Sequence, residues 1–201
     1  MLIRRQMRRL LELRIRFVPR LRAGIYRIFL GFTFRRIGKN LKVMGMDAMS
    51  IGRNLDVGDD CWIEAVKNYQ GRRYSPVLRI GNDVSISNWT HISCAMEVEI
   101  GDGCLIGSKV YIGDHSHGMP KLKLNDNSPN EEVWSPANEA LEKISSVILG
   151  KGCWICDGAV ILAGSRLAPG SIIAANSVVR SVVERPAILG GVPARVIRYL
   201  N

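Results

Sequence analysis

The sequence has few aromatic residues, few histidines and no long hydrophobic run. Aromatic residues make up 6% of the 201 residues, and only three residues are histidine. A membrane-spanning helix needs about 20 consecutive apolar residues. The longest N-terminal apolar run, residues 23–34, is shorter and contains Arg27. Arginines interrupt the apolar residues before it, so we expect no secretory signal, a cytoplasmic location and reduced thiols.

Acidic residues are nearly missing from the first 42 positions, where Glu12 is the only one beside 13 Lys or Arg. The net charge of +10 therefore belongs to a basic N-terminal arm. Nucleic-acid binding favours basic residues spread over a folded face with stacking aromatics, so we expect no nucleic-acid partner. Residues 1–18 read as a basic amphipathic helix that Pro19 should end or kink.

The arm, residues 1–42, has two main interpretations. A basic helix beside apolar residues suits a peripheral contact of residues 1–38 with an anionic membrane, such as the inner face of the plasma membrane. A solenoid also needs a cap on its open end, and a helical arm can supply one. An arginine-rich targeting sequence is a third, weaker interpretation.

The rest of the chain repeats an aliphatic residue at every sixth position, fifteen times in all. In twelve of the fifteen cases a small residue stands two places before it, the exceptions being Met49, Leu55 and Leu78. A period of six fits neither a helix nor a simple strand, but it fits a solenoid whose hexads each form one flat face. Groups of three hexads predict triangular coils. The inward aliphatic residues are Ile51, Val57, Ile63, Ile80, Ile86, Ile92, Ile100, Ile106, Ile112, Leu149, Ile155, Ile161, Leu167, Ile173 and Val179.

Three cysteines, Cys61, Cys104 and Cys153, occupy the small inward slot, where a buried thiol acts as a small hydrophobic side chain. Cys153 and Cys156 have CxxC spacing but lie inside the repeat, so we expect no redox or metal role.

The period is interrupted in three places. Residues 65–79 and 114–148 predict extruded loops, and residues 94–99 contain two more residues than the template allows. Long loops in a compact domain are usually functional or disordered. The longer loop leaves after Ile112 and the register resumes at Leu149, so its base is fixed at one corner of the solenoid.

The repeat, Ile100-Gly101-Asp102 and the C-terminal Gly190–Arg198 segment resemble the hexapeptide-repeat acyltransferases, and among them the galactoside, maltose and polysaccharide O-acetyltransferases. The resemblance covers residues 43–199. It implies a mainly β fold, a left-handed parallel β-helix, and a homotrimer in which the donor groove and the base come from different subunits. It also implies transfer from acetyl-CoA to a sugar hydroxyl, without a metal.

The base of the long loop reads Asp114-His115-Ser116-His117-Gly118. A hydroxyl that attacks a thioester needs a base, and histidine suits this because its unperturbed pKa lies near ~6.5. The resemblance implies that His115 is this base. Asp114 or a backbone carbonyl could hold its other nitrogen, and His117 is a helper or a second acceptor contact. Asn88 and His91 lie close to the family position of an acceptor-binding Asn, with Ser87 at the aligned place.

The resemblance also places the acetyl-CoA arm along the C-terminal coils. Small residues would admit pantetheine, and guanidinium groups would bind phosphate. A tryptophan near the family's active site has a match here. The expected donor-binding residues are Trp154, Ala163, Ala175, Arg180, Arg195 and Arg198.

Several alternatives share parts of this pattern. Serine acetylation and sugar-nucleotide N-acetylation need the same fold and donor. A metalloenzyme like the γ-type carbonic anhydrases would use three histidines, and His91, His115 and His117 exist. A non-catalytic scaffold would need only the β-helix. The acceptor is expected to be a sugar of a surface polysaccharide or of its lipid-linked precursor; which sugar and hydroxyl are modified is left open.

Overall fold

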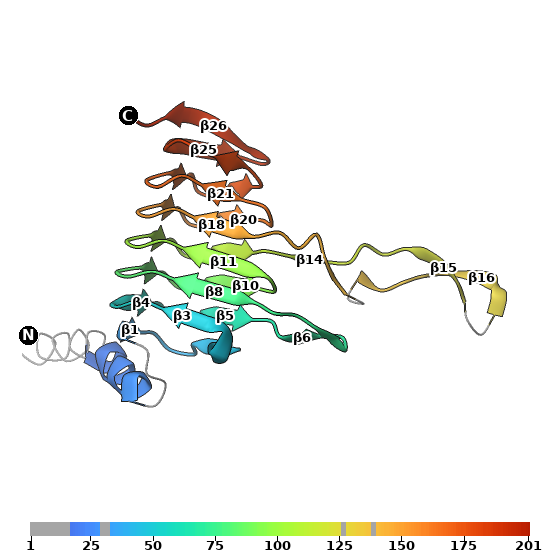
Figure 1. Ribbon diagram of the computed structural model, residues 1–201, viewed down its shortest axis with the longest axis horizontal. Coiled ribbons are helices and arrows are strands. Elements are labelled where there is room, and N and C mark those ends of the chain that lie inside the picture. Colours follow the sequence, from blue (N-terminus) through green and yellow to red (C-terminus); the bar gives the residue numbers. More distant parts are fainter. Residues whose placement is uncertain (1–16, 29–32, 126–127, 138–139) are drawn as a thin grey trace, which may run out of the picture.

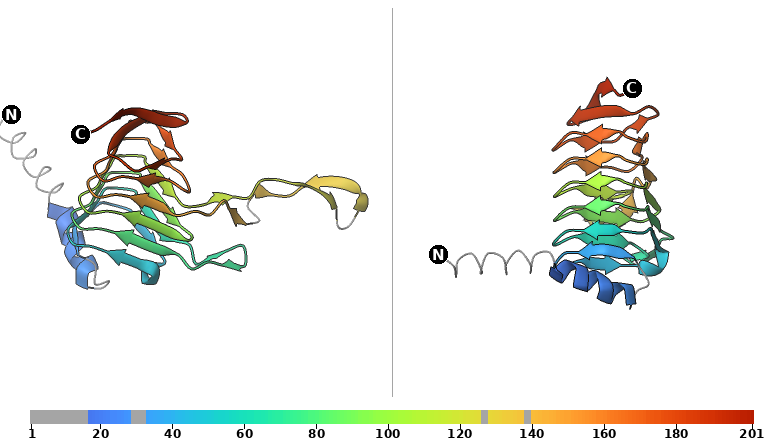
Figure 2. Two further views of the ribbon diagram at one scale, coloured as in Figure 1. Left: turned by 45° about the horizontal axis from the view of Figure 1, so that its top comes forward. Right: turned by 90° about the vertical axis from the view of Figure 1, so that its left-hand side faces the viewer.

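The protein is a triangular parallel β-helix with a helix across its N-terminal end and two extensions from one side (Figure 1). The computed structural model describes residues 17–28, 33–125, 128–137 and 140–201. Seen from the side, successive coils stack along one axis (Figure 2). Among the described residues, no helix is long and apolar enough to span a membrane.

Three sheets form the faces of the prism. The first sheet, in spatial order, contains β1 (Phe34–Ile37), β4 (Leu55–Val57), β9 (Ser85–Ile86), β12 (Leu105–Ile106), β19 (Trp154–Ile155), β22 (Ile172–Ile173), β25 (Ala187–Gly191) and β26 (Ala194–Tyr199). The second sheet contains β2 (Lys42–Met44), β5 (Trp62–Ala65), β10 (His91–Cys94), β13 (Tyr111–Gly113), β20 (Val160–Ile161) and β23 (Val178–Val179). The third sheet contains β3 (Met49–Ile51), β8 (Val77–Ile80), β11 (Glu97–Ile100), β18 (Val147–Leu149), β21 (Arg166–Leu167) and β24 (Val182–Val183).

The six-residue template places the core correctly. Fourteen of the fifteen predicted inward aliphatics are buried, and Ile51 is half-buried against the core. Leu149 pairs with Ile100, so the register does resume after the long loop. Cys61, Cys104 and Cys153 are buried and free. A hydrogen bond with Cys104, together with burial, raises the pKa of Cys153, which keeps this thiol in its unreactive form.

The parallel ladder begins earlier than residue 43. β1 pairs in parallel with β4, and Ile37 is fully buried in the core. A short 3₁₀ helix, η1 (Met46–Ala48), follows β2. The division into arm and repeat domain therefore cuts through the first coil, because residues 34–37 already supply one face of it.

Residues 17–28 form a helix across the N-terminal end of the β-helix (Figure 2). Ala23 is buried in the core cluster, and Tyr26 packs against it with an edge-on contact to Phe34. The helix of residues 17–28 thus caps the solenoid. Pro19 does not end this helix, because the fixed φ of proline is helical and allows the chain to continue on its C-terminal side. The expected helix over residues 1–16 lies outside the described residues.

Both extensions leave from the end of the second sheet. The shorter one contains the hairpin of β6 (Asn68–Tyr69) and β7 (Arg72–Arg73). The longer one contains the antiparallel pair β14 (Ser116–His117) and β17 (Leu141–Glu142), and farther out the pair β15 (Leu122–Asn125) and β16 (Ser128–Trp134). The two extensions project from the same side of the prism (Figure 1).

Candidate active site

Asp114 is a buried carboxylate at the corner where the long extension begins. Its Oδ1 accepts the backbone N–H of Ala95 at 2.8 Å, and its Oδ2 accepts those of Met96 and Glu97 at 2.7 Å each. Burial alone would raise the pKa of Asp114, but hydrogen bonds from His115 and the backbone outweigh it and lower the pKa below its usual value. The two surplus residues in segment 94–99 therefore shape a corner that holds an ionised carboxylate.

This carboxylate fixes the orientation of His115. The His115 Nδ1 lies 2.8 Å from Asp114 Oδ1, and the His115 side chain is only 9% exposed. Because an ionised carboxylate can only accept hydrogen bonds, Nδ1 carries the proton and donates it. In neutral His115 the Nε2 lone pair is then free, as a general base requires. Of the two partners open from the sequence, the structure selects Asp114.

His115 lines a cavity of about 820 Å³ on the outer surface of the second sheet. One part of the wall consists of side chains at equivalent positions in consecutive coils. Trp62, His91 and Tyr111 are in register, and so are Met44, Glu64 and Ser93. This stacking follows directly from the parallel pairing of β2, β5, β10 and β13.

Glu64 joins the polar groups of this wall. Its Oε1 accepts the Ser93 hydroxyl at 2.7 Å and lies 3.3 Å from His91 Nε2. Burial would raise the pKa of Glu64, but hydrogen bonds from His91 and Ser93 and the nearby His115 lower it overall. The His91 ring stacks on Trp62, with centroids 4.4 Å apart, and Tyr111 meets it edge-on. The cavity thus combines a carboxylate with aromatic surfaces.

The two extensions close one side of the cavity. His117 Nδ1 lies 3.1 Å from the hydroxyl of Tyr69, which belongs to the short hairpin. Tyr74 accepts the backbone N–H of Leu141 with its hydroxyl oxygen at 3.2 Å, which joins the same two extensions. His117 is exposed, and its imidazole lines the cavity without contacting Asp114 or His115 in any described hydrogen bond.

The structure separates Asn88 from His91. Asn88 Oδ1 accepts the backbone N–H of Asp59 at 2.8 Å at a different corner of the prism. A Cβ on Gly58 would lie 2.3 Å from this oxygen, so the corner is closely packed. Asn88 borders a second cavity near the N-terminal helix, away from His115. Within this chain, only His91 of the two expected acceptor residues reaches the cavity of His115.

The six expected donor-binding residues fall into two groups. Ala163 and Arg180 follow β20 and β23 and lie toward the corner of Asp114, since Gly164 N–H donates to Ser145 O and Ser145 N–H donates to Asp114 O. The second group lies on or beside the first sheet, on another face of the prism; its members are Trp154, Ala175, Arg195 and Arg198. The Trp154 side chain is 47% exposed.

Glu64, Ser93, Trp62 and Tyr111 are cavity residues that sequence reasoning did not single out. A signal existed, because Glu64, Ser93 and Gly113 each follow an inward isoleucine by one position in consecutive coils of one sheet. The described part of the chain contains no group of three His, Cys, Asp or Glu side chains arranged to hold a metal ion.

Residues 146–181 match the bacterial transferase hexapeptide family (six repeats). The chain carries the repeat of the bacterial hexapeptide transferases. This confirms the resemblance read from the sequence and, with it, the left-handed parallel β-helix.

Two Escherichia coli K12 proteins are similar in sequence. The chain is 34% identical to the putative lipopolysaccharide biosynthesis O-acetyl transferase WbbJ over 125 residues, which are 62% of this chain and 62% of WbbJ. It is 26% identical to galactoside O-acetyltransferase over 145 residues, 72% of this chain and 64% of the relative. The chain therefore spans less than two thirds of each of these relatives.

Two solved structures share the fold. The N-acyltransferase AntD from Bacillus cereus, in complex with dTDP and 3-hydroxybutyryl-CoA, superposes with a TM-score of 0.63 at 20% identity over 89% of each chain. The acetyl-CoA complex of a hexapeptide-repeat acetyltransferase from Vibrio cholerae gives a TM-score of 0.51 at 22% identity, covering 90% of this chain and 76% of that one.

Proposed function

We propose that the protein transfers an acetyl group from acetyl-CoA to a hydroxyl of a sugar, with His115 as general base. The observation that carries this proposal is the Asp114–His115 pair. A carboxylate held by three backbone N–H groups fixes the Nδ1–H tautomer, and the free Nε2 belongs to a residue that lines a cavity of about 820 Å³.

The reaction needs one proton relay. His115 Nε2 takes the proton of the acceptor hydroxyl while the oxygen attacks the thioester carbonyl. The tetrahedral intermediate then collapses, the carbon–sulfur bond breaks, and the imidazolium returns the proton to the departing CoA thiolate. Asp114 stabilises the imidazolium that forms between these two steps, because its negative charge lies beside Nδ1. No covalent acyl-enzyme is required.

The cavity wall suits a sugar acceptor. Both described partners of the Glu64 carboxylate, Ser93 and His91, contact Oε1. Oε2 can therefore accept hydrogen bonds from sugar hydroxyls. Trp62 and Tyr111 add apolar surfaces on which the C–H face of a sugar ring can pack. The name of WbbJ, a putative lipopolysaccharide O-acetyl transferase, supports a surface polysaccharide or its lipid-linked precursor as acceptor.

The donor site in this proposal forms between copies of the chain in a homotrimer. Trp154, Arg195 and Arg198 lie on a different face of the prism from His115. A neighbouring copy whose first sheet faces the second sheet of this one would bring them near the cavity. The acetyl-CoA and CoA-thioester complexes of the structural neighbours support the donor class.

Transfer to an amine is the second candidate. Another AntD complex contains dTDP-4-amino-4,6-dideoxyglucose and coenzyme A, and the same base and donor serve either acceptor. Parallel assays with hydroxyl and amino sugars would distinguish the two reactions, because turnover of the hydroxyl sugar alone supports O-transfer and turnover of the amino sugar alone supports N-transfer.

We further propose that the helix of residues 17–28 rests on an anionic membrane. Phe17, Leu21 and Ile28 are exposed on it at 65%, 55% and 81%, and Arg20 and Arg27 are close by. Such a helix binds through buried apolar area and attraction to anionic lipids. Leu21→Glu should reduce co-sedimentation with phosphatidylserine-containing vesicles, and unchanged binding would refute this part. Deleting residues 1–38 would also remove β1, so a point substitution is the cleaner test.

The test of the reaction is a CoA-release assay with acetyl-CoA and candidate sugar acceptors, comparing the wild type with His115→Ala. General-base catalysis contributes about 10²–10⁴-fold, so kcat should fall by that factor while the affinity for acetyl-CoA, measured by calorimetry, stays the same. A variant with wild-type kcat, or a wild type that does not bind acetyl-CoA, would contradict the proposal.

A further inference from the structure

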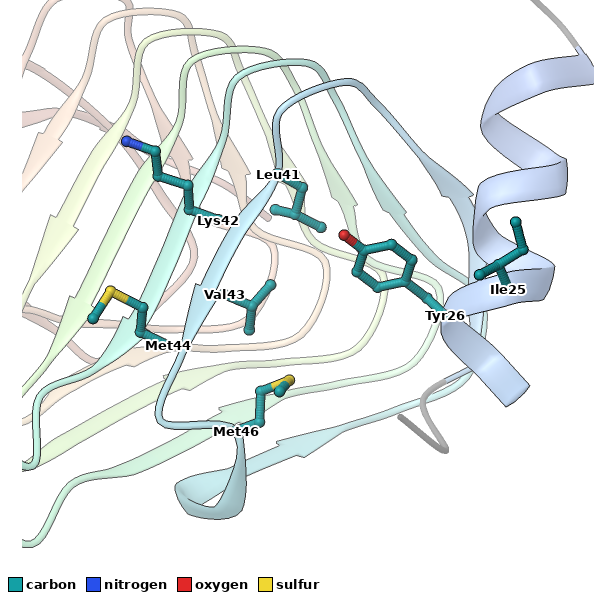
Figure 3. A pocket seen from close by; sticks show the side chains of 7 residues that line it. All are labelled: Ile25, Tyr26, Leu41, Lys42, Val43, Met44 and Met46. Atoms are coloured by element: carbon teal, nitrogen blue, oxygen red, sulfur yellow. The ribbon is translucent and has the colours of Figure 1, made fainter. Parts of the chain in front are cut away.

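A third cavity, of about 560 Å³ and distinct from the one that Asn88 borders, opens between the N-terminal helix and the first coil. Its lining is almost entirely apolar: Ile25, Tyr26, Leu41, Val43, Met44 and Met46, with Lys42 as the one charged member (Figure 3). The helix therefore caps the end of the β-helix incompletely. Its Ala23 is buried against the core, but an apolar space is left beside its Ile25 and Tyr26.

The apolar cavity adjoins the cavity of His115. Met44 lines both of them. It belongs to β2, the edge strand of the second sheet, and it pairs in register with Glu64 of the polar wall. In Figure 3, β2 runs between Val43 and Met46 on the side of the helix and Lys42 and Met44 on the other. An elongated ligand could therefore pass across the free edge of β2 from the apolar space to the polar cavity.

A cation lies at this passage. The ammonium of Lys42 lies 5.6 Å from the ring centroid of Trp62, which lines the cavity of His115. No described ion pair involves Lys42, and its side chain is exposed. The order along the passage is thus apolar chain site, positive charge, and then a polar cavity with a base.

The apolar space also opens beside the exposed apolar side of the helix. Ile25, which is 47% exposed, belongs to the cavity lining, and Leu21 and Ile28 are neighbours on the helix surface, four and three residues away. A helix that rests on a membrane with these side chains would hold the cavity mouth at the lipid surface.

We propose that the apolar cavity binds the hydrocarbon chain of a lipid-linked acceptor, with its phosphate at Lys42 and its sugar in the cavity of His115. The inference rests on the proposed function only for the sugar and its acetylation. The chain and phosphate sites are properties of the cavity and can be tested without any turnover.

The probes are octyl, decyl and dodecyl phosphate, each below its critical micelle concentration, titrated calorimetrically into the full-length protein. Each buried methylene should strengthen binding by about fourfold, until the cavity is filled and the gain ends. Ile25→Glu should weaken the binding of dodecyl phosphate at least ~10-fold, since it places a charge in the apolar lining. Leu21→Glu is the matched control, on the same helix but outside the lining, and should bind like the wild type. Lys42→Gln should weaken the binding of all three probes by the same factor, about two to five, because it removes only the charge that meets the phosphate.

Several results would overturn the proposal. These are affinity that does not depend on chain length, equal effects of Ile25→Glu and Leu21→Glu, or binding that appears only when residues 1–16 are deleted, which would assign the cavity to that segment. A change of oligomeric state in Ile25→Glu, seen by sedimentation, would assign the cavity to a second copy of the chain.

Alkyl phosphate binding without acetyl transfer to any sugar would refute the proposed function alone, and transfer without alkyl phosphate binding would refute this inference alone.

Discussion

Replacing Asp114 by Asn would test how the buried carboxylate controls His115. The two residues have nearly the same shape, but the amide has one acceptor oxygen and one donor nitrogen. In one orientation the nitrogen faces the N–H groups of Met96 and Glu97, which leaves two buried donors unpaired and makes this orientation the less stable one. In the other it faces Ala95 N–H and His115 Nδ1, and it donates to Nδ1, so the proton moves to Nε2. His115 then has no free lone pair toward the cavity.

Both orientations have a cost that can be estimated. A buried donor left without its acceptor costs about 1–3 kcal/mol, which in a chain of this size lowers Tm by about 2–4 °C for each kcal/mol. The wrong tautomer costs far more in rate, about 10⁴-fold for an Asp to Asn change in a catalytic triad, and we expect kcat to fall by about 10²–10⁴-fold. A fall in activity much larger than the loss of stability is the signature of a tautomer effect.

The assay is CoA release at saturating acetyl-CoA, together with thermal unfolding followed by circular dichroism. Asp102→Asn is the matched control, because Asp102 also accepts a backbone N–H at a corner, that of Asn82 at 2.8 Å, but no histidine contacts it. It should keep wild-type kcat. If folded Asp114→Asn keeps more than about a third of the wild-type kcat, the carboxylate does not set the tautomer and the reasoning is refuted.

Three further predictions follow from the same residues. Because the pKa of Asp114 is lowered in the folded state, its contribution to stability is present above the unfolded pKa of ~3.9 and is lost as the pH falls through the folded value; acid unfolding should begin below about pH 4 in the wild type, and Asp114→Asn should show a shallower dependence there. Glu64→Gln should raise KM for the sugar by about 10-fold with a smaller effect on kcat, because it weakens acceptor binding more than proton transfer; an unchanged KM would remove Glu64 from the acceptor site. Mixing inactive His115→Ala with an inactive Arg195→Ala/Arg198→Ala double variant should restore part of the activity if one site uses two copies, and no recovery after subunit exchange would place the donor site within one chain.

The coils could be predicted in detail from the sequence because one inward position repeats every six residues. Ile100 and Leu149, which are separated by the long extension, still pair as the template requires. The small slot also explains why Cys61, Cys104 and Cys153 are buried. In each case the residue and its environment repeat, so a local rule is enough.

The site was only partly predictable because it depends on contacts outside the repeat. The sequence gives Asp114 as one of two possible partners for His115, and only the folded corner shows that Ala95, Met96 and Glu97 supply its N–H donors. His117 and Tyr69, which are 48 residues apart in the sequence, join the two extensions, and the six-residue period does not relate their positions.

Asn88 shows where the family resemblance was a poor guide to position within one chain. Its place near a family motif suggested acceptor binding, but in the structure its side chain accepts the Asp59 N–H at another corner. The acceptor role of Asn88 stays a prediction that would need a neighbouring copy of the chain. The acceptor role of His91 also stays a prediction, but His91 lines the same cavity as His115.

The most direct test of the central claim is single-turnover acetyl transfer by the wild type and by His115→Ala, both saturated with acetyl-CoA and with the same sugar acceptor. The account predicts equal acetyl-CoA dissociation constants and an acetyl transfer rate that is about 10²–10⁴-fold lower in the variant. Equal transfer rates in the two proteins would show that His115 is not the base and would contradict the account.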